Sequence, residues 1–355
     1  MPESANGLPF QRETRQRLGE PLYRYMMGQP ADALLAAQDV NSQDLQRYRL
    51  LPRVMRANKG IDTRVQFAGS RWAAPLGVGA FAGDAIFHPE GLLPIARACK
   101  RLQLPLAISE ETVTPLNEIC AVYDGCWLQL RAAGELSRIE GLMAHAAECG
   151  AKGIILTVLA PVHPVPGLQP GGFSIGEALL QRGLKTIGST GPGVQALPAF
   201  PCWGWDELRQ ACEMAAKHRL PLLVKGILHP EDAIAAQNVG CQGIIASNIG
   251  LRQSSRWASP VQQLAELRQH YQGELVLDGG VRSGTDAVVA ACLGASLSLV
   301  VRPVISALVS GGEEAVFGLL SGWVNEITAL SHWCGVSEIS ELNPSFLTSA
   351  GGQNG

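Results

Sequence analysis

The sequence predicts an α/β fold of the (β/α)₈, or TIM, barrel class, with N-terminal and C-terminal helical extensions. Short runs rich in Val, Ile and Leu occur eight times along the 355 residues, without the polar–apolar alternation of half-exposed strands. Segments with helical periodicity separate most of these runs. Such runs suit parallel strands buried on both faces, and a strand followed by a helix eight times is the barrel pattern. We expect one domain over residues 1–355, with the barrel spanning about 73–335.

The eight expected strands are five or six residues long and mainly aliphatic. In chain order they cover 75–79, 105–109, 126–130, 153–158, 221–225, 243–247, 274–278 and 297–301. The helical segments between them include 133–149, 206–218, 230–239 and 285–293. Residues before 73 and the helical segment 306–333 are each too short to build a core, so we expect both to pack on the barrel as extensions.

The connection after the fourth strand departs from this regular pattern. Residues 161–205 are rich in Pro, Gly and Ser and contain only one short helical segment, near 175–182. Loops of this length are usually functional or mobile. The sequence leaves two interpretations open, an ordered surface excursion and a segment that covers a substrate.

Composition favours small-molecule chemistry. The formal charge is −3 at pH 7 with no block of like charges, so the chain lacks the basic footprint of a nucleic-acid binder. Nine cysteines show neither a C-x-x-C pair nor zinc-like spacing to His, which indicates reduced thiols and no metal site. The first twenty residues lack a signal-peptide pattern, and no apolar run approaches the roughly 18 residues of a membrane span. We therefore expect a cytoplasmic protein with no integral membrane segment.

Polar residues stand where the expected strands end. Barrel enzymes place their chemistry at these C-terminal strand ends. An isolated Ser or Thr there is more often a cap than a ligand, but seven polar residues in the same relative position favour a binding site. They are Ser109, Gln129, Thr157, Lys225, Ser247, Asp278 and Arg302.

The last two strand ends have the features of a phosphate site. Strand seven runs into the Gly-rich segment 278–286, which contains Gly280 and Arg282 and leads directly into a helix. Strand eight runs into Val301 and Arg302. Glycines allow close backbone approach, helix N-termini attract anions, and loops seven and eight commonly bind phosphate in this fold.

Ordered motifs in the chain resemble those of a known family. They are His-Pro-Glu-Gly at 88–91, Leu-Val-Lys-Gly at 223–226, Ser-Asn-x-Gly-x-Arg-Gln at 247–253, Leu-Asp-Gly-Gly-Val-Arg-x-Gly-Thr-Asp at 277–286 and Arg-Pro at 302–303. Together they resemble the FMN-dependent 2-hydroxy-acid oxidases and dehydrogenases, over about residues 22–342. The resemblance implies FMN as cofactor, and homo-oligomers are common among such proteins.

The resemblance also assigns cofactor-binding residues. The backbone of Ala80, Phe81 and Ala82 would face the flavin ring, and Lys225 would stabilise negative charge on the reduced ring. Val301 stands where the family usually has Gly, a departure that would crowd the phosphate loop. The remaining implied contacts are Ser109, Gln129 and Thr157 at the polar edge of the ring, Ser247 in the Ser-Asn motif, Asp278 on the ribityl chain, and Gly280, Arg282 and Arg302 at the phosphate.

The catalytic centre departs from the family pattern. The family's catalytic histidine would follow Ser-Asn, where this chain has Ile249, and its orienting aspartate would fall at Leu159. An aliphatic side chain cannot accept a proton. Loss of both is coherent, because a buried aspartate without its imidazole partner would carry an uncompensated charge.

The substrate side is mixed. Tyr25 and Arg252 match residues that hold a substrate carboxylate, whereas Arg131 replaces a family tyrosine and Glu111 a tryptophan. Glu111 and Arg131 follow neighbouring strands, so we expect them to face each other. They form either a plain ion pair at the rim or a polar substrate site in which Glu111 acts as a replacement base.

Three functions then compete. The favoured one is an FMN-dependent oxidoreductase that acts on a carboxylate-bearing small molecule with non-standard proton handling, so that Tyr25, Glu111, Lys225 and Arg252 form the catalytic set. The second is a flavin-binding homologue without catalysis, acting as a regulatory or partner subunit. The third, another phosphate-binding barrel enzyme such as an isomerase, would leave Lys225 and Arg282 without an explanation.

Overall fold

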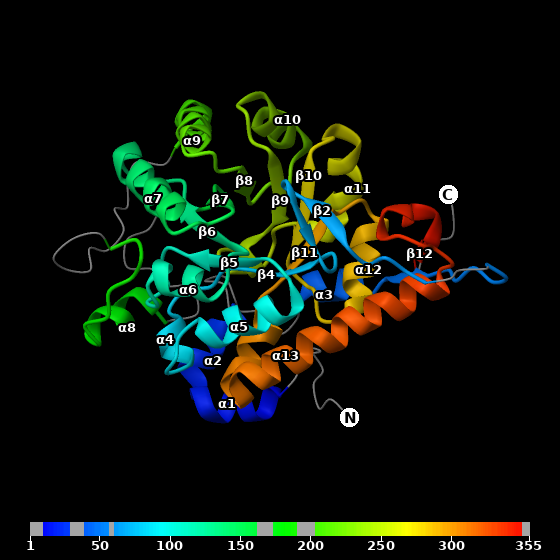
Figure 1. The fold of residues 1–355 in the computed structure, drawn as a ribbon, viewed down its shortest axis with the longest axis horizontal. Helices are drawn as coiled ribbons and strands as arrows, with labels where there is room; N and C mark the ends of the chain where they lie inside the picture. Colours follow the sequence, from blue (N-terminus) through cyan, green and yellow to red (C-terminus); the bar gives the residue numbers. More distant parts are fainter. Residues whose placement is uncertain (1–9, 29–38, 57–59, 162–172, 190–202, 350–355) are drawn as a thin grey trace.

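The computed structural model describes residues 10–28, 39–56, 60–161, 173–189 and 203–349. Its centre is a closed barrel of parallel strands in the order β10-β11-β4-β5-β6-β7-β8-β9 (Figure 1). This confirms the predicted fold class. The strands are β4 (Leu76–Val78), β5 (Leu106–Ser109), β6 (Cys126–Arg131), β7 (Gly153–Thr157), β8 (Leu222–Lys225), β9 (Gly243–Ser247), β10 (Glu274–Asp278) and β11 (Leu297–Val300).

Helices surround the barrel and follow the predicted segments within a few residues. The helix expected over 133–149 begins later, because Gly134 adopts φ 78° and helical geometry starts only after Glu135. The last helix begins at Arg302, directly after β11, with Pro303 in its first turn, where proline is well tolerated. The barrel helices are α4 (Asp84–Phe87), α5 (Leu93–Leu102), α6 (Leu116–Val122), α7 (Leu136–Glu148), α9 (Trp205–Lys217), α10 (Pro230–Asn238), α11 (Pro260–His270), α12 (Gly284–Cys292) and α13 (Arg302–Trp333).

A hairpin closes the N-terminal mouth of the barrel. It consists of β2 (Val65–Phe67) and β3 (Ser70–Trp72), which pair antiparallel. Phe67 at its tip lies against Trp127 near the start of β6, with ring centroids 5.8 Å apart. The hairpin therefore leaves the opposite mouth, where the strands end, as the open face.

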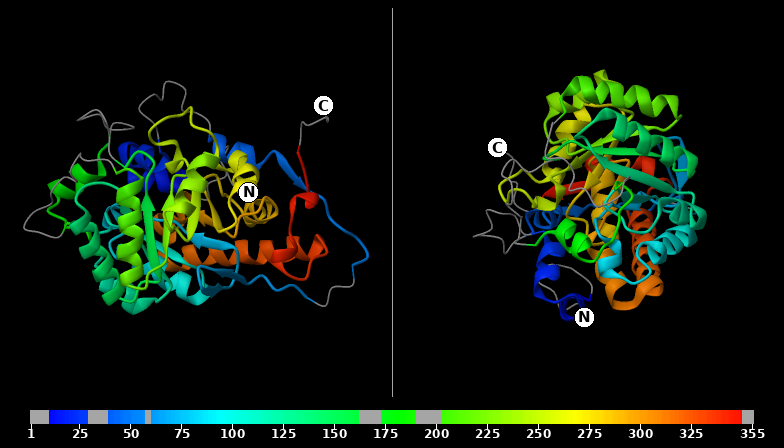
Figure 2. Two further views of the ribbon diagram at one scale, coloured as in Figure 1. Left: turned by 90° about the horizontal axis from the view of Figure 1, so that it is seen from above. Right: turned by 90° about the vertical axis from the view of Figure 1, so that its left-hand side faces the viewer.

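The residues outside the barrel pack on it as extensions. The remaining elements are α1 (Gln11–Leu18), α2 (Glu20–Met27), α3 (Val40–Leu45), β1 (Tyr48–Leu50), α8 (Ile175–Gln181), the 3₁₀ turns Ile249–Leu251, Ile339–Glu341 and Pro344–Phe346, and β12 (Leu347–Ser349). β1 pairs antiparallel with β12, so the N-terminal segment is tied to the end of the chain. Figure 2 shows α13 along one flank of the barrel, extending past it toward this pair.

Helix α13 is long and apolar enough, by length and composition, to cross a membrane. The sequence predicted no such segment, because Glu313 and Glu314 interrupt the apolar run of α13. These residues pair with Arg97 and Arg101 of α5, at 2.5 and 2.6 Å. Its inner face is buried against the barrel, as expected for a core helix of a globular protein.

The long connection after β7 is described over residues 173–189 and 203–205, and the rest lies outside the described residues. The described part contains α8, close to the helix expected near 175–182. Ile175 and Leu179 of α8 pack into a second apolar cluster with Leu22 and Met26 of α2, beside the open mouth of the barrel.

Candidate active site

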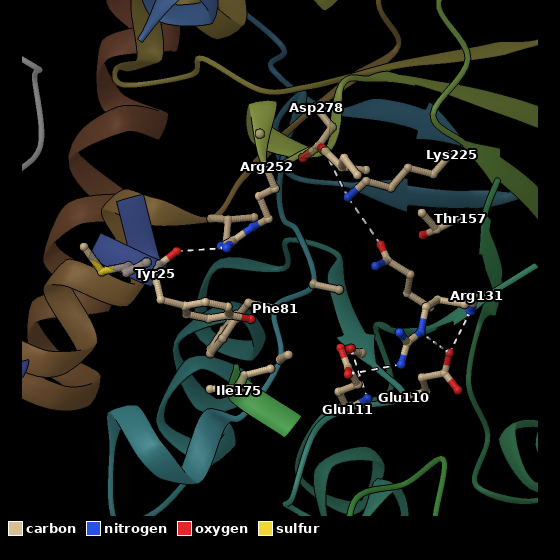
Figure 3. Close-up of a pocket in the computed structure, with 18 of the residues that line it drawn as sticks. Tyr25, Phe81, Glu110, Glu111, Arg131, Thr157, Ile175, Lys225, Arg252 and Asp278 are labelled. Atoms are coloured by element: carbon tan, nitrogen blue, oxygen red, sulfur yellow. Dashed lines mark hydrogen bonds and ion pairs between the residues drawn. The ribbon is translucent and has the colours of Figure 1, made fainter. Parts of the chain in front are cut away.

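A cavity of about 680 Å³ opens at the C-terminal mouth of the barrel. Residues at or just beyond the end of every barrel strand line it, together with residues of α2, α3 and α8 (Figure 3). Of the residues singled out from the sequence, only Ser247 does not line it. Those that do are Tyr25, Ala80, Phe81, Ala82, Ser109, Glu111, Gln129, Arg131, Thr157, Lys225, Arg252, Asp278, Gly280, Arg282, Val301 and Arg302.

A buried ionic network forms one side of this cavity. Lys225 Nζ lies 3.0 Å from Asp278 Oδ2 and donates a hydrogen bond of 3.4 Å to Gln129 Oε1. Ser247 Oγ, which lies outside the cavity lining, donates to Asp278 Oδ2 at 2.6 Å and so fixes the position of this carboxylate. A buried ammonium is stable when its charge is balanced in this way. Lys225 therefore presents a fixed positive charge to the cavity.

Two arginines converge at the ends of β10 and β11. Arg282 Nη2 and Arg302 Nη1 both face the Oδ2 of Asp39, the latter at 3.6 Å. Gly28 at φ 70° makes room for this cluster, because a Cβ there would clash with the Arg302 guanidinium. Burial lowers the pKa of Arg302 to about 10, so the side chain stays charged at neutral pH. The two arginines expected at the phosphate site thus lie together, and we call this pair the phosphate cradle. Asp39, which the sequence analysis did not identify, lies inside it.

Tyr25 and Arg252 meet at another part of the wall. Arg252 Nη1 donates to the backbone oxygen of Tyr25 at 2.8 Å, and its guanidinium lies over the Tyr25 ring at 4.6 Å from the centroid. Phe173 packs on the same ring at 5.3 Å. Burial raises the pKa of the Tyr25 phenol, which therefore remains a neutral hydrogen-bond donor. The pair offers a cation and a hydroxyl to a ligand.

Glu111 and Arg131 pair at the ends of β5 and β6. Arg131 Nη2 donates to Glu111 Oε1 at 3.1 Å, which confirms that the two residues face each other. Glu110, whose side chain is buried, binds the backbone nitrogen of Arg131 at 2.8 Å and the guanidinium of Arg138. Burial disfavours the charge of Arg131, but Glu111 and Glu110 outweigh it and raise its pKa. No donor among the described residues reaches the second oxygen of Glu111, which is left for a ligand.

An apolar segment of the wall contains Ile249 and Leu159. Ile249 has φ 47°, a rare conformation for a β-branched residue, and Leu251 follows at φ 60°. Leu159 fits because Gly226 has no side chain; a Cβ on Gly226 would clash with Leu159. Neither side chain can exchange a proton, so proton transfer in this cavity must involve another group.

Comparison with known proteins identifies the family. A model of the FMN-dependent dehydrogenases matches residues 14–349. This chain belongs to the FMN-dependent dehydrogenase family. It is similar to a 4-hydroxymandelate oxidase of Amycolatopsis orientalis, 31% identical over 333 residues, covering 90% of this chain and 91% of the relative. An L-lactate oxidase of a Roseobacter species is 28% identical, covering 97% of this chain and 94% of the relative.

Solved structures agree with the sequence comparison. Mandelate oxidase with (S)-2-phenylpropionate matches with a TM-score of 0.79 and 29% identity, covering 96% of this chain and 96% of that one. A mandelate oxidase variant with a C4a-OH-FMN adduct matches with a TM-score of 0.80 and 28% identity, covering 96% and 98%.

The cavity of this chain suits FMN. Among the described residues, Thr157 Oγ1 and Arg282 Nε are buried without hydrogen-bond partners, and buried polar atoms of this kind need a partner. The Val301 side chain packs against Gly79. A Cβ on residue 79 would lie only 2.8 Å from Val301 Cγ2, so the glycine makes room for Val301 beside the cradle. Lys225 and the two cradle arginines would hold the ring and the phosphate, and bound FMN would supply a two-electron acceptor.

Several supporting residues were not found from the sequence. Glu110 and Arg138 fix Arg131 and connect it to Gly188 of the long loop, whose backbone oxygen accepts from Arg138 at 3.3 Å. Asp84 accepts from the backbone of Val113 at 2.6 Å and from Thr114, and so it fixes the segment that carries Glu111. The sequence signal for Glu110 was present in part, since a second carboxylate beside Glu111 also follows β5.

Proposed function

We propose that this flavoprotein oxidises a 2-hydroxy acid that carries a further polar or anionic group, with Glu111 as the proton acceptor. One observation carries the proposal: the Glu111–Arg131 pair lines the cavity, whereas the wall is aliphatic at Ile249 and Leu159, where the sequence resemblance leads us to expect the base and its aspartate. A carboxylate can serve as a general base when it lies within hydrogen-bond reach of the substrate proton.

Arg252 and Tyr25 are suited to hold the substrate carboxylate. A guanidinium can bind a carboxylate with two parallel hydrogen bonds, and Arg252 lines the cavity while its Nη1 donates to the Tyr25 backbone oxygen. The relatives named for mandelate and lactate support a 2-hydroxy-acid substrate. Phe81 and Phe173 provide apolar surface for the rest of such a molecule.

Arg131 distinguishes this chain's substrate from those simple acids. It carries a guanidinium into the cavity, and its side chain is 31% exposed. Such a group either binds a second anionic group or orients Glu111. Both roles favour a substrate larger or more polar than lactate.

The competing function is a flavin-binding subunit without turnover. The aliphatic side chains of Ile249 and Leu159 favour it, because a general base typically contributes roughly 10²–10⁴-fold to a rate. The cytoplasmic location and homo-oligomeric assembly expected from the sequence stay predictions.

The two functions are separated by following the flavin spectrum anaerobically in FMN-loaded protein while 2-hydroxy acids are added. We expect lactate, glycolate and mandelate to bleach the flavin slowly or not at all, and a 2-hydroxy acid with a second carboxylate or a polar side chain to bleach it fast. Glu111→Gln should remove most of the fast reduction, by about 10²-fold or more. Glu118→Gln, a matched change on the exposed face of α6, should not.

A flavin that only dithionite reduces would contradict turnover and support the binding subunit. Fast reduction by lactate in both the wild type and Glu111→Gln would show that this carboxylate is not the proton acceptor.

A further inference from the structure

The phosphate cradle contains a carboxylate of the chain itself. Asp39 Oδ2 contacts the Arg282 guanidinium and lies 3.6 Å from Arg302 Nη1. The three side chains are almost fully buried, with exposed fractions of 10%, 7% and 13% for Asp39, Arg282 and Arg302. Asp39 is therefore a full ionic partner of both arginines and not a surface neighbour.

The position of this carboxylate is fixed by the local chain. Asp39 is the N-cap of α3, and its other oxygen, Oδ1, accepts from the backbone nitrogen of Ser42 at 3.4 Å. Asn41, two residues later, exchanges two amide hydrogen bonds of 2.8 and 2.7 Å with Asn248. The N-terminus of α3 is thus anchored to the loop after β9, and Asp39 is held at the mouth of the cradle.

The charge of Asp39 determines how it affects the binding of a phosphate group. A phosphate monoester carries about −1.5 to −2 charges at pH 7. Burial alone would raise the pKa of Asp39, but the charges of Arg282 and Arg302 outweigh it and hold the pKa below its usual value. Asp39 is then ionised at neutral pH, and the two arginines and one aspartate leave the cradle a net charge of +1.

We propose that Asp39 is an internal anion that competes with the FMN phosphate for Arg282 and Arg302, and so weakens the preference of this chain for FMN over riboflavin. For the phosphate to bind, Asp39 must either turn away from the arginines or share them with the phosphate, which carries the same sign of charge. Both alternatives lower the affinity for FMN. Riboflavin has the same ring and ribityl chain without the phosphate, so Asp39 does not oppose it. The inference rests on flavin binding in the cavity and is independent of the proton transfer proposed above.

The test measures dissociation constants for FMN and riboflavin by quenching of flavin fluorescence. Asp39→Asn removes the charge and keeps the size, and Asn is as good an N-cap as Asp. Asp39→Ser is a second variant that also caps α3, in case the first does not fold. Asp44→Asn, on the same helix and paired outside the cavity with Arg47, is the matched control.

We expect Asp39→Asn or Asp39→Ser to bind FMN about tenfold more tightly or better, because a like charge near the phosphate is removed. Riboflavin affinity should stay within about twofold, and Asp44→Asn should leave both constants near wild type. Thermal melting adds a second readout. Without flavin the Asp39 variants should melt lower, because two buried arginines lose their counter-ion, and FMN should raise their melting temperature more than that of the wild type.

An FMN affinity that falls or stays unchanged in the Asp39 variants would overturn the inference, as would an equal gain for riboflavin. A wild-type preference for FMN above about a hundredfold would match two unopposed arginines and would also contradict it. Failure of the proposed function leaves these constants unaffected. FMN binding by neither wild type nor variants would remove the flavin site, and this inference with it.

Discussion

At the scale of single residues, the proposed substrate depends on the ion pair between Glu111 and Arg131. Arg131 is tied on one side to Glu110, which is buried, and on the other to Glu111, which faces the cavity. The arginine is therefore held rigidly while one oxygen of Glu111 stays available. This arrangement is compatible with a base, a ligand contact or a plain ion pair.

A double-mutant cycle on ligand affinity separates these roles. We expect Arg131→Ala to weaken binding of a dicarboxylate about tenfold, and to do so also in a Glu111→Gln background, since a direct charge-assisted hydrogen bond is lost. The measurement is the ligand-induced change of the flavin spectrum. A loss that vanishes in the Glu111→Gln background would show that Arg131 only neutralises Glu111. No effect of either single change would leave both as rim charges.

Residues of the site differ in how far the sequence predicted them. Lys225, Arg282 and Arg302 follow strands within recognisable motifs, so their convergence follows from barrel topology. Asp39 lies 243 positions from Arg282 and precedes no strand of the barrel, so nothing local marks its contact with the cradle. Glu110 becomes identifiable as a support only once Arg138 and the long loop are placed around it.

At the scale of elements, α8 covers one side of the cavity. Ile175 and Leu179 belong to the apolar cluster shared with α2, whereas Gln181 at the end of the helix is exposed and lies outside the cavity lining. The sequence predicted this helix but left its role open between surface excursion and cover. Its contacts with the cavity wall favour the covering role, which stays a prediction for the bound substrate.

Truncating the buried face of α8 should loosen this cover. We expect Leu179→Ala to raise the access of iodide to bound flavin and to raise KM several-fold, because burying a leucine typically contributes roughly 2–5 kcal/mol to local packing. The main unfolding transition should move little, since Leu179 lies outside the barrel core. Gln181→Ala on the same helix, at an exposed position outside the cavity lining, is the control. Equal effects of the two changes, or none from Leu179→Ala, would contradict a covering role for α8.

At the scale of the whole molecule, the barrel separates stability from function. The β2–β3 hairpin and Phe67 close one mouth, and the polar strand ends meet at the other. The order of strands and most helices followed from apolar runs and helical periodicity. Helix α13 begins four residues before the predicted start at 306, because only Val301 separates the end of β11 from Arg302.

The central claim is that the cradle at the ends of β10 and β11 holds the phosphate of FMN in a cavity that spans all eight strand ends. Its most direct test is to identify the flavin that the protein releases on denaturation or takes up when FMN or FAD is added, in wild type and in Arg282→Ala. We expect about one FMN per chain and no FAD, because the two arginines suit a terminal monophosphate. Arg282→Ala should weaken FMN binding about tenfold or more through loss of a charge-assisted hydrogen bond, while Arg209→Ala on the exposed face of α9 should leave it unchanged. A wild-type protein that neither releases flavin nor binds added FMN would contradict the account.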